Sequence, residues 1–102
     1  MKEYLIAENP NPDRPHNQRL YKFPNNYGAS VVWSDGGGLL VRGSETHPYE
    51  LAVLKFYSEN MYYLDYETSI TNDVIGYQNE EQITDLLIRI KNLEGDVNES
   101  VS

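Results

Sequence analysis

Carboxylates are the most numerous side chains in this sequence that could do chemistry, and most of them lie in the second half. Residues 1–43 carry a formal charge of +1 and residues 44–102 carry −9, so the net charge of −8 arises entirely after residue 43. A phosphate backbone or an anionic membrane surface is bound by basic side chains, which this half lacks. The charge pattern therefore argues against direct nucleic-acid or membrane binding and favours a protein partner with a basic surface.

Six of these carboxylates are expected to project from one layer, around a predicted hairpin and a predicted helix. Asp65 and Glu67 share the polar face of a strand, and Glu81 and Asp85 lie one helical turn apart. A simpler interpretation is that these groups only solvate the surface and complement the helix dipole, and both interpretations stay open. The predicted partner-binding residues are Asp65, Glu67, Asp73, Glu80, Glu81 and Asp85.

The remaining reactive residues do not form a catalytic or metal-binding pattern. The two histidines, His16 and His47, are 31 positions apart, and zinc needs three or four converging ligands. The glycines of 34–38 are not followed by the Gly-Lys-Ser/Thr of a phosphate-binding loop, so a turn is expected there. Thr71 to Asp73 lack the ligand spacing of a calcium loop and predict a local turn. We therefore expect no catalytic residue, no metal and no cofactor, and a protein that is not an enzyme.

Length and composition indicate the number of domains and the cellular compartment of the protein. A chain of 102 residues has the length of one domain, and it has no cysteine for disulfides, thiolate metal sites or nucleophilic catalysis. Its apolar runs are far shorter than the ~20 residues that span a bilayer, and Met1 to Tyr4 do not begin a signal peptide. These features predict a cytoplasmic protein.

Hydrophobic periodicity predicts a sheet followed by one helix. Alternating or β-branched segments indicate strands, and two of them, 50–57 and 61–70, form the clearest hairpin. At 80–93 the apolar residues recur with helical spacing, and Asn79 and Gln82 form a capping-box pattern. Gly95 is a residue type that commonly ends a helix. The stripe expected to dock on the sheet is Ile83, Leu86, Leu87, Ile90 and Leu93. The full set of predicted strands is 3–7, 19–23, 29–33, 39–42, 50–57 and 61–70.

These elements predict an α+β fold, a small antiparallel sheet of four or five strands with the C-terminal helix packed on one face. Prolines at positions 10, 12 and 15 separate an N-terminal arm, residues 1–18, from a single domain at 19–95. Residues 96–102 are expected to be a flexible tail. Nine tyrosines suit half-buried strand positions, and they are also the residue type that binding surfaces favour.

Three strings of residues also carry a resemblance. Asn25–Val32, Tyr49–Leu54 and Tyr66–Gly76, followed by a helix rich in leucine and isoleucine, resemble a family of small uncharacterised proteins encoded by bacteriophages and prophages. The resemblance covers about residues 21–93, and its specific parts are Tyr-Gly-Ala-Ser-Val-Val and Ile-Thr-x-Asp-Val-Ile-Gly. The chain departs from the family in residues 1–18 and in 34–48, where the family tends to have a tyrosine- and glycine-rich hairpin.

The resemblance implies a phage accessory protein and transfers no catalytic residue. By analogy, such a protein binds and modulates or inhibits a host protein, for example a defence or nucleic-acid-processing factor, in the host cytoplasm. Two other functions stay open: a homo-oligomeric structural or scaffolding protein, with a homodimer as its simplest form, and a small-molecule or nucleotide-binding module.

Overall fold

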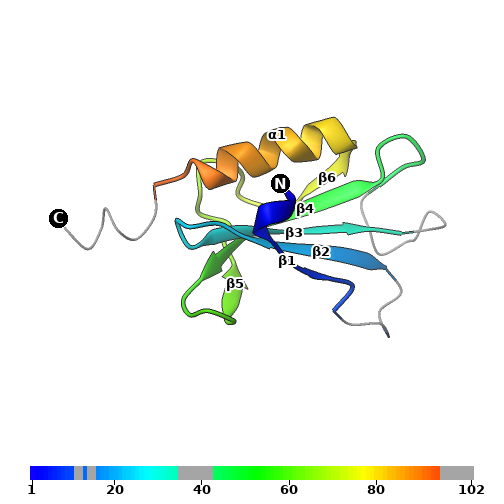
Figure 1. The fold of residues 1–102 in the computed structure, drawn as a ribbon. Helices are drawn as coiled ribbons and strands as arrows, with labels where there is room; N and C mark the ends of the chain where they lie inside the picture. The colour runs from blue at the N-terminus through cyan, green and yellow to red at the C-terminus, as the bar shows by residue number, and fades with distance from the viewer. Residues whose placement is uncertain (11–12, 14–15, 35–42, 95–102) are drawn as a thin grey trace.

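The computed structural model describes residues 1–10, 13, 16–34 and 43–94, and it shows one helix packed on one face of an antiparallel sheet (Figure 1). The predicted α+β class is confirmed. The elements are β1 (Leu5–Glu8), β2 (Asn17–Lys22), β3 (Tyr27–Trp33), β4 (Tyr49–Phe56), β5 (Tyr62–Leu64), β6 (Ile75–Gln78) and α1 (Glu80–Lys91).

The strands follow the order β1-β2-β3-β4-β5, and every pair is antiparallel. Strand β4 is the centre of the sheet, since it pairs with β3 along one side and with two short strands along the other. Strand β5 pairs with Leu54 to Phe56, and β6 pairs with the first half of β4, from Tyr49 to Leu51. The two short strands therefore share one edge of β4.

Side chains alternate across the sheet, so that one face of each strand meets the helix. The main core on this covered face joins strand residues such as Val31, Leu51 and Val53 to the helix. The four helix residues in the core, all buried, are Ile83, Leu86, Leu87 and Ile90. They are the first four residues of the predicted stripe, and Leu93 packs against the core as a partly buried neighbour.

Both ends of α1 have specific hydrogen bonds. At the start, the Asn79 side chain accepts from the Gln82 backbone N–H at 2.8 Å, and the Gln82 side chain accepts from the Asn79 N–H at 2.8 Å. This is the predicted capping box. At the end, Asn25 Nδ2 donates to the carbonyl oxygens of Ile90, Lys91 and Leu93 over 2.9–3.1 Å. A residue of the β2–β3 turn thus satisfies carbonyl groups that a helix end leaves open.

The predicted strands at 19–23, 29–33 and 50–57 are confirmed as β2, β3 and β4, with no end shifted by more than two residues. The strand predicted at 61–70 is wrong in length, because β5 ends at Leu64. Asp65 Oδ1 accepts the backbone N–H of Glu67 at 2.9 Å, and Thr68 Oγ1 accepts that of Ile70 at 3.2 Å. These local hydrogen bonds turn the backbone away from the ladder.

Strand β6 has no counterpart among the predicted strands, so it was not predicted from the sequence. Tyr77 has a positive φ of 56°, and the register shifts between its two flanking pairs. A left-handed residue within a bulge interrupts the alternation by which strands are recognised in a sequence.

The N-terminal segment contributes a real strand. Residues 2–4 form one 3-10 turn, and the predicted strand at 3–7 occurs as β1, which pairs with β2. Met1, Tyr4 and Leu5 pack against the main core. The predicted strand at 39–42, the glycine turn at 35–38 and the tail at 96–102 lie outside the described residues.

Candidate functional site

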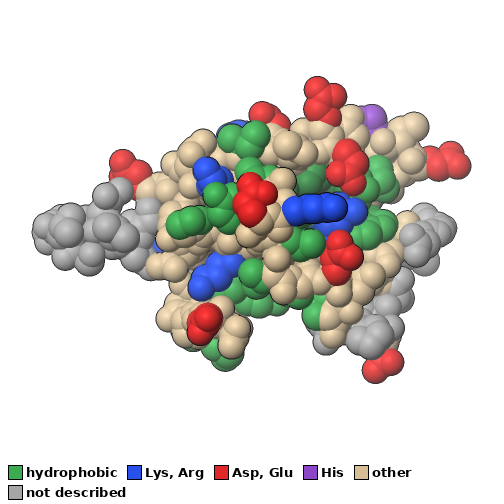
Figure 2. All heavy atoms as spheres, in the orientation of Figure 1, with side chains coloured by type: hydrophobic (Ala, Val, Ile, Leu, Met, Phe, Trp, Pro, Cys, Tyr) green, Lys and Arg blue, Asp and Glu red, His purple; other side chains and the backbone are tan. Residues whose placement is uncertain are grey.

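The structure does not gather the six predicted carboxylates into one cluster. Asp65, Glu67 and Asp73 lie between β5 and β6, whereas the other three lie in the first turns of α1. On the face shown in Figure 2, acidic side chains are separated from one another and interspersed with lysine and arginine. The six residues therefore divide into three groups with different surroundings.

Glu80 is engaged within the molecule. Its Oε1 lies 3.4 Å from Arg19 Nη1 and accepts a hydrogen bond from the Tyr49 hydroxyl at 2.5 Å. The Arg19 guanidinium also lies over the Trp33 ring, 4.6 Å from its centroid, and Trp33 packs edge-on against Tyr49. This network joins β2, β3 and β4 to the start of α1, so Glu80 fixes the helix on the sheet.

The network shifts two pKa values. Burial raises the pKa of Tyr49, and the hydrogen bond to Glu80 and its negative charge raise it further, while Arg19 opposes them. Burial alone would lower the pKa of Arg19, but the charge of Glu80 and its hydrogen bond outweigh that effect and raise it. Both shifts follow from placing a carboxylate, a phenol and a guanidinium in one partly buried site.

The carboxylates of the β5–β6 connection shape local turns. Besides the Asp65 turn, Thr71 Oγ1 donates to the Asp73 carbonyl oxygen at 2.9 Å and accepts the Asp73 N–H at 3.1 Å. Asp73 Oδ1 in turn accepts the N–H of Val74 at 2.7 Å. The predicted local turn at 71–73 is confirmed. Glu67 and Asp73 are exposed, and Asp65 is half-buried.

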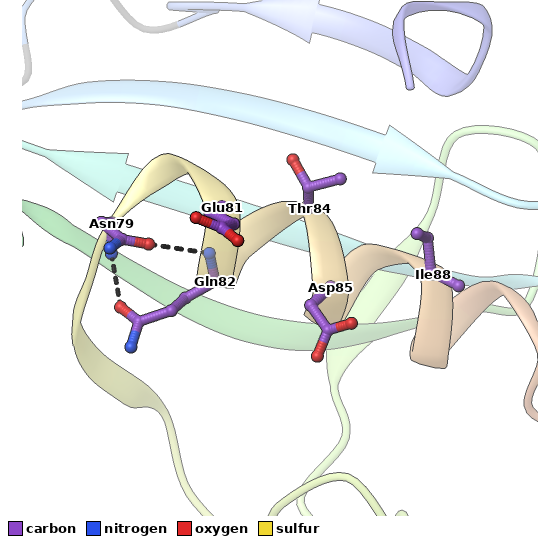
Figure 3. Close-up of a pocket in the computed structure, with 6 residues that line it drawn as sticks. All are labelled: Asn79, Glu81, Gln82, Thr84, Asp85 and Ile88. Atoms are coloured by element: carbon purple, nitrogen blue, oxygen red, sulfur yellow. Dashed lines mark hydrogen bonds between the residues drawn. The ribbon is translucent and has the colours of Figure 1, made fainter.

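Glu81 and Asp85 lie on the solvent side of α1, as the sequence predicts. Together with Asn79, Gln82, Thr84 and Ile88 they line a shallow, open depression, and Figure 3 shows these side chains along one side of the helix and its cap. All six belong to one helix and its cap, so no second element closes over a ligand. The depression is part of an acidic helix surface.

A more distinctive surface lies on the β4–β5 hairpin. Its large apolar side chains are between 38% and 62% exposed, including Tyr62, Leu64 and Tyr66, which alternate in the sequence with the predicted polar face of Asp65 and Glu67. Both faces of β5 are open to solvent, and Tyr57 stacks on Tyr63 with ring centroids 6.3 Å apart. We call this group the hairpin surface; its members are Tyr57, Met61, Tyr62, Tyr63, Leu64 and Tyr66.

Charge separates the hairpin surface from the rest of the molecule. Between Phe56 and Ile88 the sequence has seven carboxylates and neither lysine nor arginine. Lys22 lies over the Phe56 ring and Lys91 over the Tyr4 ring. The described ring contacts of Tyr57, Tyr62 and Tyr63 are with other aromatic rings instead. The hairpin surface thus combines exposed tyrosines with carboxylates from a segment that has no cation of its own.

Within residues 1–10, 13, 16–34 and 43–94, no group of three or more potential ligand side chains is arranged to hold a metal ion. In the same part of the chain, no helix has the length and apolar character needed to cross a membrane. No protein-family profile matches the sequence, and neither curated proteins nor solved structures gave a match.

Proposed function

We propose that this protein is a non-enzymatic binding module that docks a protein partner with a basic surface. The hairpin surface provides the contact area, and Asp65 and Glu67, which lie next to it in the chain, provide the charge. Following the resemblance to phage-encoded proteins, we further propose that it is a phage accessory protein that modulates or inhibits a host protein in the host cytoplasm.

The observation that supports this function is the exposure of six large apolar side chains on one short hairpin. Contiguous exposed apolar surface on a small domain is typical of interaction sites, and tyrosine is enriched at the centre of interfaces. Strand β5 has three exposed side chains, and its main contact with the core is that of Tyr62 with the buried Phe56. Its side chains are therefore better explained by a partner than by folding.

The charge of the surrounding segment supports a basic partner. Carboxylates beside the hairpin surface would attract such a partner over a distance of about one Debye length, roughly 8–10 Å at ordinary salt. An arginine or lysine of the partner could also lie over an exposed tyrosine ring. Glu80 is the least suitable of the six predicted binding residues, because it already pairs with Arg19 and Tyr49.

Affinity capture from host cells with matched variants tests this function. The wild type is compared with a tyrosine variant (Tyr57→Ser with Tyr63→Ser) and with a charge variant (Asp65→Lys with Glu67→Lys). A control variant, Glu45→Lys with Glu94→Lys, makes the same charge change at exposed positions away from the hairpin.

The proposal requires one protein that the wild type and the control capture and that both hairpin variants lose. Its complex with the wild type should also weaken steeply as salt rises. Identical captured proteins for all four forms would contradict the proposal.

Exposed tyrosines also support a second function, a homo-oligomeric scaffold in which two hairpin surfaces meet. Light scattering after size-exclusion chromatography separates the two functions. A stable dimer that becomes monomeric in the Tyr57→Ser, Tyr63→Ser variant favours the scaffold, because its loss would show that the hairpin surface is buried against a second copy.

A further inference from the structure

The outer side of β5 is a free edge of the sheet. Strand β5 is the last in the order β1-β2-β3-β4-β5, and among the described residues only β4 pairs with it. In Figure 1 the β4–β5 hairpin projects from the sheet on the side away from α1. A free edge presents backbone N–H and C=O groups with which a strand of another chain can pair.

The hydrogen bonds of the hairpin show which backbone groups of β5 point outward. Asp65, the residue after β5, donates its N–H to the Val53 carbonyl oxygen of β4 at 2.9 Å, so its backbone faces β4. Alternate residues of an antiparallel strand bond to the same neighbour, so the backbone of Tyr63 also faces β4. The N–H and C=O groups of Tyr62 and Leu64 therefore point away from β4, toward the free edge.

The side chains next to this edge are apolar or aromatic on both faces of the sheet. Tyr62 and Leu64 lie on the face opposite α1, where they line a hollow of about 300 Å³. Tyr63 lies on the other face, and its ring stacks on that of Tyr57. A strand added beside β5 would therefore contact tyrosine or leucine side chains on both faces.

The two outermost strands of the sheet differ in how their edges are protected. Charged side chains and bulges on an edge strand hinder pairing with another chain. Strand β1, at the opposite end of the order, includes Glu8, and its register on β2 shifts between Leu5 and Ala7. Strand β5 consists of Tyr-Tyr-Leu, with no charge, no proline and no shift of register. Its edge is therefore the more suitable of the two for a further strand.

The charge around β5 determines which kind of strand fits. Glu59 before β5 and Glu67 after it are both exposed, and residues 57–87 contain neither lysine nor arginine. In an antiparallel pairing of two copies, the segment before β5 of one copy would lie beside the segment after β5 of the other. Like charges would then meet, which destabilises strand pairing. A strand that carries lysine or arginine meets opposite charge instead.

We infer that the free edge of β5 binds an extended basic segment of the partner, which adds to the sheet as a further antiparallel strand. This inference rests on the proposed function and specifies how the partner binds. Outward backbone groups of Tyr62 and Leu64 pair with the segment, and apolar side chains opposite them pack on the same face. Between these, a lysine or arginine side chain lies on the face of Tyr63, over its exposed ring. The expected sequence of the segment alternates apolar and basic residues.

A nuclear magnetic resonance titration of the isotope-labelled full chain with three peptides tests this inference. The parent probe is the blocked peptide Gly-Lys-Val-Arg-Val-Lys-Gly, whose valines are expected opposite Tyr62 and Leu64. A second peptide carries N-methyl groups on both valines, which removes the N–H groups that would face β5. A third carries them on the arginine and the second lysine, whose N–H groups would face solvent.

We expect the parent and the third peptide to shift the amide resonances of Tyr62 and Leu64 with similar affinity. The second peptide should bind about tenfold more weakly or worse, because hydrogen bonds of the new ladder are lost. A peptide with glutamate in place of each basic residue should leave the resonances unchanged.

Variants of the protein test the same contact from the other side. Leu64→Pro removes an outward N–H, and proline is tolerated on an edge strand where its nitrogen faces solvent. Leu64→Ala keeps that N–H and is the matched control. We expect Leu64→Pro to bind the parent peptide about tenfold more weakly than Leu64→Ala does. If Leu64→Pro does not fold, the two methylated peptides still decide.

A second pair of variants tests the charge. Glu59→Gln with Glu67→Gln should weaken binding of the parent peptide and flatten its salt dependence, because two carboxylates beside the edge are lost. Glu45→Gln with Glu94→Gln makes the same change at exposed positions away from β5 and should bind as the wild type does.

Several outcomes would overturn the inference. Equal binding of the two methylated peptides would exclude edge pairing, and shifts at Ile6 instead of β5 would place the added strand on β1. A wild-type dimer that Leu64→Pro dissociates and Leu64→Ala does not would show that a second copy occupies the edge. If a host protein is captured through the hairpin surface and Leu64→Pro retains it, edge pairing is wrong and the proposed function stands.

Discussion

The two faces of the sheet are made by the same strands, and they differ in what covers them. The covered face is closed by α1, and its buried residues join three strands to the helix in one core. The open face has a much smaller buried cluster, Leu20, Leu54 and Phe56, beside a hollow of about 300 Å³. The helix α1 covers only one of the two faces (Figure 1).

The charged side chains of the two faces differ in their surroundings. On the covered face, Arg19, Tyr49 and Glu80 satisfy one another and fix the helix. At the hairpin, carboxylates and tyrosines meet solvent in a segment without lysine or arginine, and Lys22 lies over Phe56 on the neighbouring part of the open face. Internal pairing of charged side chains therefore links the helix to the sheet on the covered face, and we propose that the hairpin carboxylates instead meet a positively charged partner.

The largest expected effect is a difference in stability between variants of the covered face and a variant of the hairpin. Ile90 of α1 is fully buried against the sheet, so Ile90→Ala should lower the free energy of unfolding by about 2–4 kcal/mol. Leu86→Ala should lower it by nearly as much. Leu64→Ala on the exposed strand β5 should cost less than about 1 kcal/mol. Urea denaturation of the three variants measures this; equal losses would show that the hairpin belongs to the core.

Gly28 tests whether the small cluster of the open face is tightly packed. A Cβ at this position would overlap the carbonyl oxygen of Tyr21 and come within 2.7 Å of Phe56 Cε1. Gly28→Ala should therefore destabilise the protein by about 1–3 kcal/mol. Thermal denaturation checks the value, and a neutral result would mean that both the Tyr21 backbone and the Phe56 ring can shift to make room.

Asn25 tests how the helix is held at its C-terminal end. Its side chain bonds three carbonyl oxygens near that end and accepts the N–H of Tyr27 at 3.0 Å. Asn25→Ala should cost about 1–2 kcal/mol, because carbonyl groups lose their partner. Hydrogen exchange should show faster opening at the end of α1, while the exchange of the central strand stays slow.

The smallest effect concerns pH. Because the pKa of Tyr49 is raised in the folded protein, the unfolded chain releases this proton first, at about pH 10. The contribution is fully present below that pH and is lost as the pH rises through the folded value. Tyr49→Phe should therefore lose less stability than the wild type in alkaline solution, as pH-dependent denaturation can show. Glu80→Gln should lower the Tyr49 pKa toward its ordinary value.

Local patterns were sufficient to predict much of this fold. The capping box at Asn79 and the helical stripe from Ile83 onward are read within single turns, so neighbouring residues specify them. The strands that became β2, β3 and β4 alternate or are continuously apolar for similarly local reasons. The packing of the helix on the sheet follows from the stripe.

Features that depend on distant residues were not predictable in this way. Arg19 and Glu80 are 61 positions apart, so their pairing follows only once the strands and the helix are placed. Register brings Ser30 beside Ala52, and these two small side chains line the hollow of the open face. The length of β5 was overestimated because Asp65 fits a strand pattern, although its side chain forms a turn instead. These residues acquire their roles only in the assembled sheet.

The sharing of one β4 edge by β5 and β6 has a consequence for folding kinetics. Strands β4, β5 and β6 and helix α1 all lie within residues 49–91, so their contacts close short loops. Strands β1, β2 and β3 form a second local unit by successive antiparallel pairing. Local contacts form quickly because little chain entropy is lost. The slow step should then be the meeting of the two units along β3 and β4, where the helix stripe first finds the other half of its core.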